Sequence, residues 1–412
     1  MIKKKYAIVG AGGRAKMMFA RPLVTELKDF AELVGICDTN LHRANLMNDE
    51  CGGNIPVFSD FDEMIASSKP DAVIITTPDG IHHEYIIRTL EAGCDAISEK
   101  PMTVDAEKCR AILAAEQRTG KKVTVTFNRR FIPYVSRLKE LLDSGAIGKI
   151  HSVHLEWFLD RKHGADYFRR WHRRMENSGG LLIHKATHHF DMINWLIDDE
   201  PEQLYAFGDL RFYGPNREQR GERCFTCMHK QSCELYFDIT ASEFTKQLYF
   251  DGESFDGYVR DRCVFGEDIN IYDTMSLNVK YARGTYLSYS LTAYNPKEGW
   301  KASFIGSDGR IEAQESRSVE SNEIHIYDRK GALSTVQVPR ATGAHGGGDQ
   351  RLRRMIFAGD VDDTLGQQAG SWAGAMSLMI GAAANVSISE GKKVVISELL
   401  GVRKESAVDG AS

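Results

Sequence analysis

The chain has 412 residues, of which 42% are hydrophobic and 26% are charged, a composition typical of globular proteins. A chain of this length is too long for one small hydrophobic core, so we expect two domains. The formal net charge of −5 argues against a nucleic-acid partner or an anionic membrane surface. We find no apolar run long enough for a signal peptide or a membrane span, and we read residues 371–389 as a closely packed Ala/Gly-rich helix. We therefore expect a cytoplasmic protein with no membrane partner.

A glycine-rich turn follows the first predicted strand. Residues 5–9 form a short apolar run, Gly10-Ala-Gly-Gly-Arg-Ala15 comes directly after it, and a helical pattern follows. This order of strand, glycine turn and helix is the context of a dinucleotide-binding fingerprint, in which the helix N-terminus binds phosphates. We expect the cofactor to be bound here by Gly10, Gly12, Gly13 and Arg14.

The second predicted strand, residues 32–37, ends at Asp38. A carboxylate at this position can accept both ribose hydroxyls of NAD and would repel the 2′-phosphate of NADP. We therefore predict NAD rather than NADP, with Arg43 also at the cofactor. The alternative role for Asp38 is the N-cap of a helix that begins at Leu41.

The first third of the chain alternates strands and helices. Strands are predicted at 71–77, 94–98 and 122–126, with helices at 81–90 and 105–118 between them. Repeated units of this kind form a doubly wound parallel sheet of the Rossmann type, which we end at residue 126. Ligands bind beyond the carboxyl ends of such strands, which adds five cofactor residues: Thr77, Pro78, His82, Glu99 and Lys100.

Lys100 stands at a strand end, beside the expected position of a cationic nicotinamide. Like charge disfavours the ammonium form, so Lys100 is a candidate acid or base for a substrate hydroxyl. The alternative is an ordinary surface lysine.

Paired strands replace this alternation in the rest of the chain, at 150–158, 275–281 and 286–293, and in hairpins around 307–309 and 329–331. We predict an α+β second domain over residues 127–403, with a large open, mostly antiparallel sheet, and a frayed tail at 404–412. An open sheet needs a cover, so we expect a homodimer or homotetramer through this sheet. Residues 345–349 are predicted to open a helix with Asp349 as its N-cap.

The stretch 178–195 holds three histidines within six residues. On one helix, His184, His188, Asp191 and Trp195 share a face. The opposite face forms the buried stripe, with Ala186, Phe190, Ile193 and Ile197. The alternative is a solvated polar face on an ordinary amphipathic helix.

Aromatic and cationic side chains alternate just before this stretch. Tyr167, Arg170, Trp171 and His172 suit the ring faces and hydroxyls of a carbohydrate. A mobile lid or a solvated basic turn is the alternative.

Four of the eight cysteines form a separate pattern, Cys224-x2-Cys227-x5-Cys233 with Cys263 further along. Tetrahedral sulfur coordination of a structural zinc is the natural interpretation, with His229 as an alternative ligand. The other four cysteines are predicted to be buried free thiols.

The ordered set of motifs resembles the glucose–fructose oxidoreductase, inositol dehydrogenase and MocA family over nearly the whole chain. The motifs are Gly10-Ala-Gly-Gly, Thr77-Pro-x3-His82-x-Glu84, Glu99-Lys-Pro101, Asn128-x-Arg130-Phe131 and Ser178-Gly-Gly…His188-x-x-Asp191. The resemblance implies NAD(P)-dependent oxidation or reduction of a sugar or polyol carbon. It also implies that Lys100 and His188 are catalytic, that Lys100–Pro101 is cis, and that subunits associate through the sheet.

The chain departs from this family at His184, where the family commonly has an acidic residue four positions before its catalytic histidine. We place His184 in the catalytic site and expect four further substrate contacts nearby. A His184–His188 metal pair is the alternative to a purely organic site. The expected flanking contacts are Lys185, His189, Arg130 and Asp191, with the aromatic segment before them.

These observations predict an NAD-dependent oxidoreductase that transfers a hydride to or from a secondary alcohol of a carbohydrate. One alternative keeps NAD but cleaves a glycoside through transient oxidation, elimination and re-reduction. The other is a non-catalytic protein that binds NAD or sugar.

Overall fold

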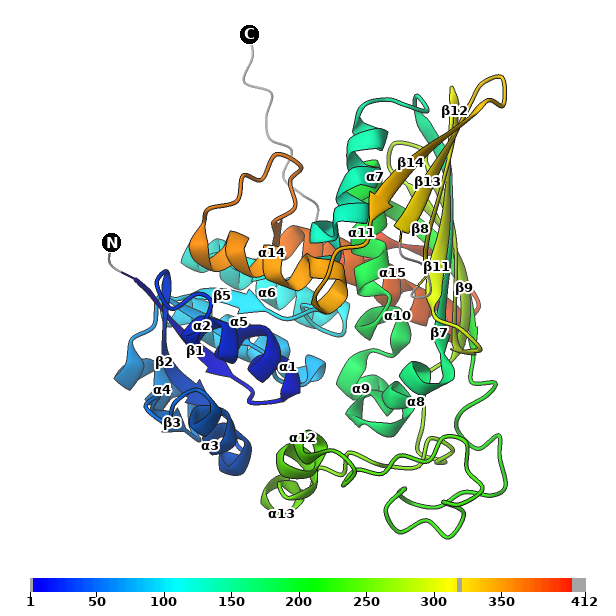
Figure 1. Ribbon diagram of the computed structural model, residues 1–412. Helices are drawn as coiled ribbons and strands as arrows, with labels where there is room; N and C mark the ends of the chain where they lie inside the picture. Colours follow the sequence, from blue (N-terminus) through cyan, green and yellow to red (C-terminus); the bar gives the residue numbers. More distant parts are fainter. Residues whose placement is uncertain (1–2, 317–320, 402–412) are drawn as a thin grey trace.

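The computed structural model describes residues 3–316 and 321–401 and forms two sheets with helices between them (Figure 1). The predicted tail at 404–412 and the last two residues assigned to the second domain lie outside the described residues. In Figure 1 the first sheet lies at the left, and the second stands nearly edge-on at the right.

The first sheet has seven strands in the order β15-β6-β5-β4-β1-β2-β3, six of them parallel. This is the predicted Rossmann sheet, and its central strands are apolar because both faces are covered. Its strands are β1 (Lys4–Val9), β2 (Ala31–Cys37), β3 (Val57–Phe58), β4 (Ala72–Ile75), β5 (Asp95–Ser98), β6 (Val123–Val125) and β15 (Ala369–Gly370).

Helices connect these strands on both faces of the sheet. Asn40, and not Asp38, is the N-cap of α3, because its side chain accepts the backbone N–H of Arg43 at 3.2 Å. Asp38 therefore remains available to the site. The helical segments are α1 (Gly13–Ala15), η1 (Lys16–Ala20), α2 (Arg21–Val24), α3 (Leu41–Glu50), α4 (Phe61–Ser68), η2 (Asp79–Ile81), α5 (His82–Glu91) and α6 (Ala106–Thr119).

The second sheet has nine strands in the order β14-β13-β12-β11-β7-β10-β9-β8-β16, and all its pairs are antiparallel except β7 with β10. Alternate residues face the core, as Leu287, Tyr289 and Leu291 do in β10. The strands are β7 (Ile150–Asp160), β8 (Pro201–Asp209), β9 (Thr274–Tyr281), β10 (Tyr286–Asn295), β11 (Gly299–Gly306), β12 (Gly309–Ser316), β13 (Ser321–Asp328), β14 (Leu333–Pro339) and β16 (Val394–Val395).

The helices of this second half lie mainly between the two sheets (Figure 1). They position most of the substrate side of the site described below. Their bounds are η3 (Asn128–Phe131), α7 (Pro133–Asp143), α8 (Arg161–Arg169), η4 (Trp171–Arg173), α9 (Met175–Ser178), α10 (Leu181–His184), α11 (Thr187–Ile197), α12 (Glu243–Thr245), η5 (Lys246–Phe250), α13 (Glu253–Asp256), η6 (Ala344–Gly347), α14 (Gly348–Arg353), η7 (Arg354–Ala358), α15 (Ser371–Glu390) and α16 (Ile396–Leu400).

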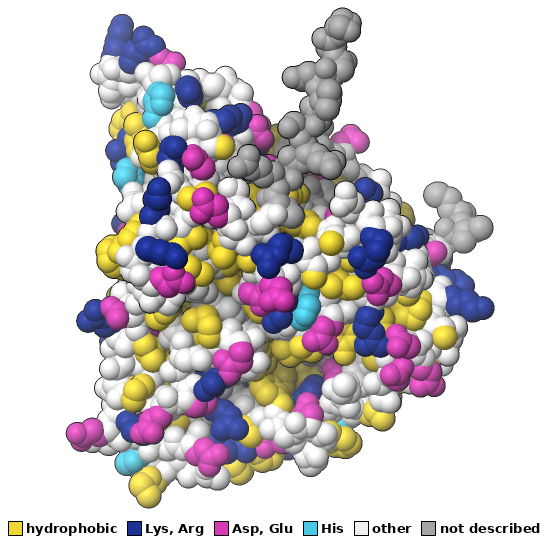
Figure 2. All heavy atoms as spheres, turned by 180° about the vertical axis from the view of Figure 1, so that it is seen from behind, with side chains coloured by type: hydrophobic (Ala, Val, Ile, Leu, Met, Phe, Trp, Pro, Cys, Tyr) yellow, Lys and Arg dark blue, Asp and Glu magenta, His cyan; other side chains and the backbone are white. Residues whose placement is uncertain are grey.

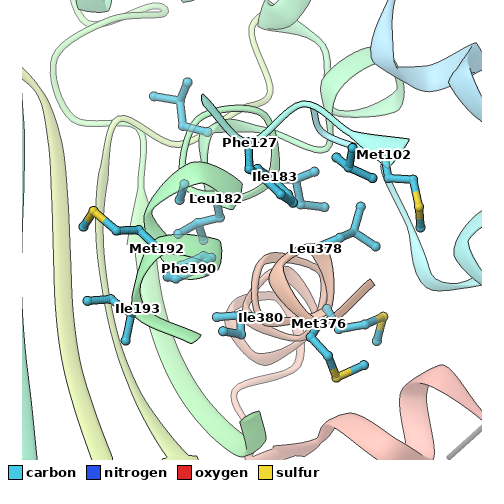
Figure 3. Close-up of a cluster of buried hydrophobic side chains, with 14 of the residues drawn as sticks. Met102, Phe127, Leu182, Ile183, Phe190, Met192, Ile193, Met376, Leu378 and Ile380 are labelled. Carbon is cyan, nitrogen blue, oxygen red and sulfur yellow. The ribbon is translucent and has the colours of Figure 1, made fainter. Parts of the chain in front are cut away.

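The stretch predicted as one helix over 178–195 is broken. Gly179 ends α9 with a φ of +66°, and the regular hydrogen-bond pattern is interrupted again between α10 and α11, where Ala186 N–H donates to the Leu181 carbonyl at 2.8 Å. The predicted stripe is nevertheless buried. Figure 3 shows its Phe190 and Ile193 gathered with Leu378 and Ile380 of α15.

α15 is long and apolar enough to cross a membrane by composition alone, yet 72% of its apolar window is buried inside the protein. It packs against α10, α11 and β8, as the core helix of a folded domain does. On the face in Figure 2, acidic and basic side chains are mixed, with no concentration of one sign.

The chain returns to the first sheet after β14. Leu352, Met355 and Phe357 pack against its core, where the Phe357 ring contacts Tyr6 edge to face at 4.9 Å between centroids. β15 then pairs with β6. The first sheet is thus completed by residues that follow the predicted boundary at 126.

Candidate active site

A cavity of about 640 Å³ lies between the two halves, beyond the carboxyl ends of the parallel strands. All eleven predicted cofactor residues line it, although they come from separate turns. They are Gly10, Gly12, Gly13, Arg14, Asp38, Arg43, Thr77, Pro78, His82, Glu99 and Lys100.

The glycine turn is shaped for close approach. Gly10 has a φ of +92°, and a Cβ there would lie 2.7 Å from the backbone of Thr76 and Thr77, so only glycine fits. A Cβ on Gly12 would meet nothing within 4 Å, which leaves the backbone open toward the cavity. These features fit the pyrophosphate of a dinucleotide.

Asp38 is fixed at the end of β2. Its Oδ2 accepts the backbone N–H of Ala11 at 2.6 Å, and its Oδ1 accepts that of Asn40 at 2.7 Å. Arg43 Nη2 lies 3.9 Å from Oδ1. The carboxylate is therefore anchored where the ribose of a dinucleotide lies in this fold.

Arg14 ties the glycine turn to two distant elements. Its Nε donates to Glu99 Oε1 at 2.7 Å, and its Nη1 donates to Asp349 Oδ2 at 3.0 Å. Asp349 also accepts from Asn128 at 2.6 Å and contacts His345 Nδ1 at 2.9 Å. Asp349 is consequently not the predicted N-cap; the backbone of Gly347 holds that position, and the carboxylate joins the site.

His82 joins two strand ends, since its ring nitrogens lie 2.8 Å from the carbonyl oxygens of Pro101 and Thr77. It is buried, and burial lowers its pKa. The peptide bond between Lys100 and Pro101 is cis, as the family resemblance implies.

Lys100 is the central cation of the cavity. Its Nζ donates to the backbone oxygen of His184 at 2.9 Å. Burial lowers the pKa of Lys100, while Asp79 and Glu99 oppose this shift. The lowered pKa makes the neutral amine of Lys100 more accessible, as a residue that exchanges a proton requires.

Asp79 pairs with His184, because Oδ2 and Nδ1 lie 2.5 Å apart. Burial raises the pKa of Asp79 and lowers the pKa of His184, and the nearby Lys100 opposes the first shift and adds to the second. His184 stands where the family commonly has an acidic residue, and Asp79 of η2 places a carboxyl group next to it from across the cavity.

Two further histidines face this pair. His172 stacks on Trp171 at 3.7 Å between ring centroids and meets His184 edge to face at 4.1 Å. Burial holds the pKa of His172 and His188 well below the usual range. The Nδ1 atoms of both are buried and have no hydrogen-bond partner in the protein.

Tyr167 borders the same cluster. Its hydroxyl lies 2.9 Å from His163 Nε2, and His163 Nδ1 lies 2.9 Å from Glu298 Oε2. Tyr167 and His163 line the cavity, and Glu298 does not.

The wall next to His188 is aromatic. His189 stacks on Trp157 at 3.5 Å between centroids, and its Nδ1 lies 2.8 Å from the Tyr289 hydroxyl. Its Nε2 has no protein partner, and the ring lines the cavity beside Lys185.

Arg170 is held by Asp166 of α8 at 3.2 Å. Burial opposes ionisation of Asp166, but Arg170 and Arg260 outweigh it and lower the pKa of Asp166 to about 2. Both side chains line the cavity together with Trp171.

Arg130 and Asp191 are placed differently from the prediction. They form a buried two-bond ion pair, with contacts of 2.9 and 2.6 Å, and neither lines the cavity. Their ion pair joins η3 to α11, and neither side chain faces a substrate.

Several lining residues were not predicted. Asp79 follows a predicted strand end, and that position was the available signal. Asn128 belongs to a family motif and His345 to the stretch that opens a helix, but neither was assigned to the site. Others reach the cavity through tertiary packing: Arg129, Trp157, His163, Asp166, Asn177, Tyr249, Asp256 and Tyr258.

The predicted zinc site is not found. Cys224, Cys227, Cys233 and Cys263 are free thiols lining a cavity of about 20 Å³, with His229 nearby. Within residues 3–316 and 321–401, no group of three or more potential ligands is arranged to hold a metal ion.

The fold and the anchored glycine turn define a Rossmann-type oxidoreductase that binds a nicotinamide dinucleotide. Residues 4–127 match an oxidoreductase family with an NAD-binding Rossmann fold, and residues 139–396 match the C-terminal alpha/beta domain of the same family. The chain therefore belongs to the glucose–fructose oxidoreductase, inositol dehydrogenase and MocA family.

Individual relatives are similar over different lengths. The chain is 36% identical to YteT of Bacillus subtilis (strain 168), and the matched region covers 96% of this chain and 98% of YteT. It is 30% identical to an inositol 2-dehydrogenase of Rubrobacter xylanophilus over 49% of this chain and 54% of that protein. The WlbA dehydrogenase of Bordetella pertussis, solved with NADH and UDP-GlcNAcA, shares the fold with a TM-score of 0.67 at 20% identity, over 96% of this chain and 99% of WlbA.

Proposed function

We propose that this protein is an NAD-dependent dehydrogenase that acts on a secondary alcohol of a sugar, polyol or sugar derivative. The observation that carries the proposal is Lys100, a half-buried lysine at a Rossmann strand end, which lines one cavity with His188 and His184. An inositol 2-dehydrogenase and a D-glucoside 3-dehydrogenase of Escherichia coli (strain K12) among the relatives support the substrate class.

Each predicted residue has a distinct part in this proposal. NAD, when bound, supplies the hydride acceptor, and Asp38 favours it over NADP. Lys100 and His188 exchange the hydroxyl proton of the substrate, and burial keeps both able to accept it. Tyr167, Arg170, Trp171, His172, Lys185 and His189 form the surrounding wall that orients the sugar ring.

The test is a panel of sugars and polyols incubated with the purified protein and NAD, in which the absorbance of NADH is followed. Steady formation of NADH with one substrate class supports the proposal. Tight NAD binding with no turnover on sugars or glycosides would contradict it and favour a non-catalytic binding protein.

A second candidate is a glycoside-cleaving enzyme that oxidises, eliminates and re-reduces its substrate. The Asp79–His184 pair favours it, because elimination needs a base for a second proton in addition to the hydroxyl proton. Release of an aglycone with solvent deuterium incorporation and no net NADH would distinguish it from the dehydrogenase.

We also propose a homodimer or homotetramer through the nine-stranded sheet. Its outer face carries a shallow depression of about 390 Å³ lined by polar residues such as His154, Glu156, Asn278 and Lys301. In Figure 1 the helices lie on the opposite face of this sheet. A monomer in light scattering would contradict this assembly.

The free thiols agree with a reducing compartment, and the cytoplasmic location stays a prediction.

A further inference from the structure

The connection between β8 and β9 extends from the second sheet to the cofactor side of the cavity. α12, η5 and α13 lie in this connection, and Figure 1 shows them at the bottom, next to α3. We call residues 237–258 the strap. Its buried Leu248 and Tyr249 pack with Leu46 of α3, so it is a fixed part of the fold.

The strap is bonded to the loop that carries Asp38. Asn40, which is fully buried, donates its side-chain N–H to the carbonyl of Gly252 at 3.0 Å. His42 Nε2 lies 2.8 Å from the carbonyl of Gln247, and the His42 ring stacks on Phe255. Asn40 also hydrogen-bonds the side chain of Asp256.

The strap also meets the glycine turn, where Gly13 N–H donates to the Tyr249 hydroxyl at 3.2 Å. Tyr249 and Asp256 both line the cavity. The strap therefore contacts the dinucleotide site at both the phosphate-binding turn and the end of β2.

Asp256 is directed at Arg43. Asp256 Oδ2 and Arg43 Nη2 form an ion pair, and the same Nη2 lies 3.9 Å from Asp38 Oδ1. The three side chains are only 11 to 21% exposed, so solvent screens them weakly. Asp256 Oδ1 also accepts the backbone N–H of Tyr258 at 3.1 Å, which fixes its orientation.

An arginine beside the ribose is the usual means of accommodating the 2′-phosphate of NADP. Here Arg43 is already compensated by Asp256, and a phosphate would have to enter beside two carboxylates. We propose that Asp256 determines cofactor choice: it holds Arg43 away from a 2′-phosphate and adds a second carboxylate to Asp38, so that NAD is selected over NADP. This inference rests on the proposed NAD-dependent function.

The experiment is a fluorescence titration of the purified full-length protein with NADH and with NADPH. We expect Asp256→Ala and Asp256→Asn to raise the affinity for NADPH relative to NADH by roughly ten- to a hundredfold, the range for one charge-assisted hydrogen bond gained at a phosphate. Adding Arg43→Ala to Asp256→Ala should remove most of this gain, because Arg43 would be the group that binds the phosphate.

Glu253→Gln is the matched control. Glu253 lies on the same short helix but pairs with Arg223. The affinity of the Glu253→Gln variant for NADPH relative to NADH should therefore equal that of the wild type. An unchanged ratio in both Asp256 variants, or a wild type that prefers NADPH, would overturn the inference. A wild type that binds neither nucleotide would instead refute the proposed function, so the two failures are distinguishable.

Discussion

The two sides of the cavity are built in different ways. The cofactor side consists largely of turns that directly follow β1, β2, β4 and β5, and backbone groups and anchored carboxylates shape it. The substrate side consists of side chains from α8, η4, α10, α11 and η6, which meet only when the second sheet and its helices pack. The first depends on local backbone geometry, and the second depends on tertiary packing.

The electrostatics differ in the same way. On the cofactor side Arg14 is compensated by Glu99 and Asp349. On the substrate side burial favours the neutral forms of His172, His184 and His188. One side is organised to hold charge, and the other is organised to exchange protons.

The largest expected effect is a loss of turnover, which involves the substrate side, without a loss of NADH binding on the cofactor side. Lys100→Met should lower turnover by roughly 10²–10⁴-fold, the usual contribution of a positioned acid or base, while NADH still binds. Turnover and NADH titration of the same preparation measure the two effects. Lys108→Met, on α6, is the control and should retain activity. Full activity in the Lys100 variant would show that the residue exchanges no proton.

A smaller effect should appear in the support beneath the substrate side. Asp191→Asn leaves Arg130 buried without its ionised partner and should lower the free energy of unfolding by about 3–5 kcal/mol. Glu140→Gln breaks the exposed pair with Arg137 and should cost about 1 kcal/mol or less. Denaturant unfolding measures both, and equal losses would contradict the structural role given to Arg130 and Asp191.

The smallest expected effect is a displacement of the pH profile. The carboxylate of Asp79 opposes the burial that lowers the pKa of Lys100. Asp79→Asn should lower that pKa further, and neutral Lys100 is present above its pKa. The limb of kcat/KM on which alcohol oxidation rises with pH should therefore move to lower pH. Asp62→Asn, at an exposed position, should leave the limb in place; a shift to higher pH for Asp79→Asn would contradict the coupling.

The difference between the two sides also explains what could be predicted from the sequence. The eleven cofactor residues belong to short motifs next to strand ends, so periodicity and glycine spacing were sufficient to place them at one cavity. The hairpins of the second sheet were equally predictable, because each carries its own turn signal.

Tertiary packing determines the features of the site that could not be predicted from the sequence. The pairing of His184 with Asp79 joins residues 105 positions apart, and no local pattern encodes it. Arg130 and Asp191 belong to family motifs, but a motif does not reveal whether a pair faces the ligand or supports the helix that does. The cysteine spacing suggested a metal, whereas in the described part of the chain the four thiols share a small cavity without the arrangement that a metal ion needs.

The late return of the chain to the first sheet has a consequence for biosynthesis. Residues 4–125 emerge from the ribosome more than two hundred residues before β15 and the helices that carry Leu352, Met355 and Phe357. Until then β6 lacks its edge partner, and the apolar surface around Tyr6 and Phe19 lacks the Phe357 ring. Exposed strand edges and apolar patches favour association with other chains. The nascent nucleotide-binding half should therefore be prone to association, and it reaches its final structure only after residues 352–370 have been synthesised.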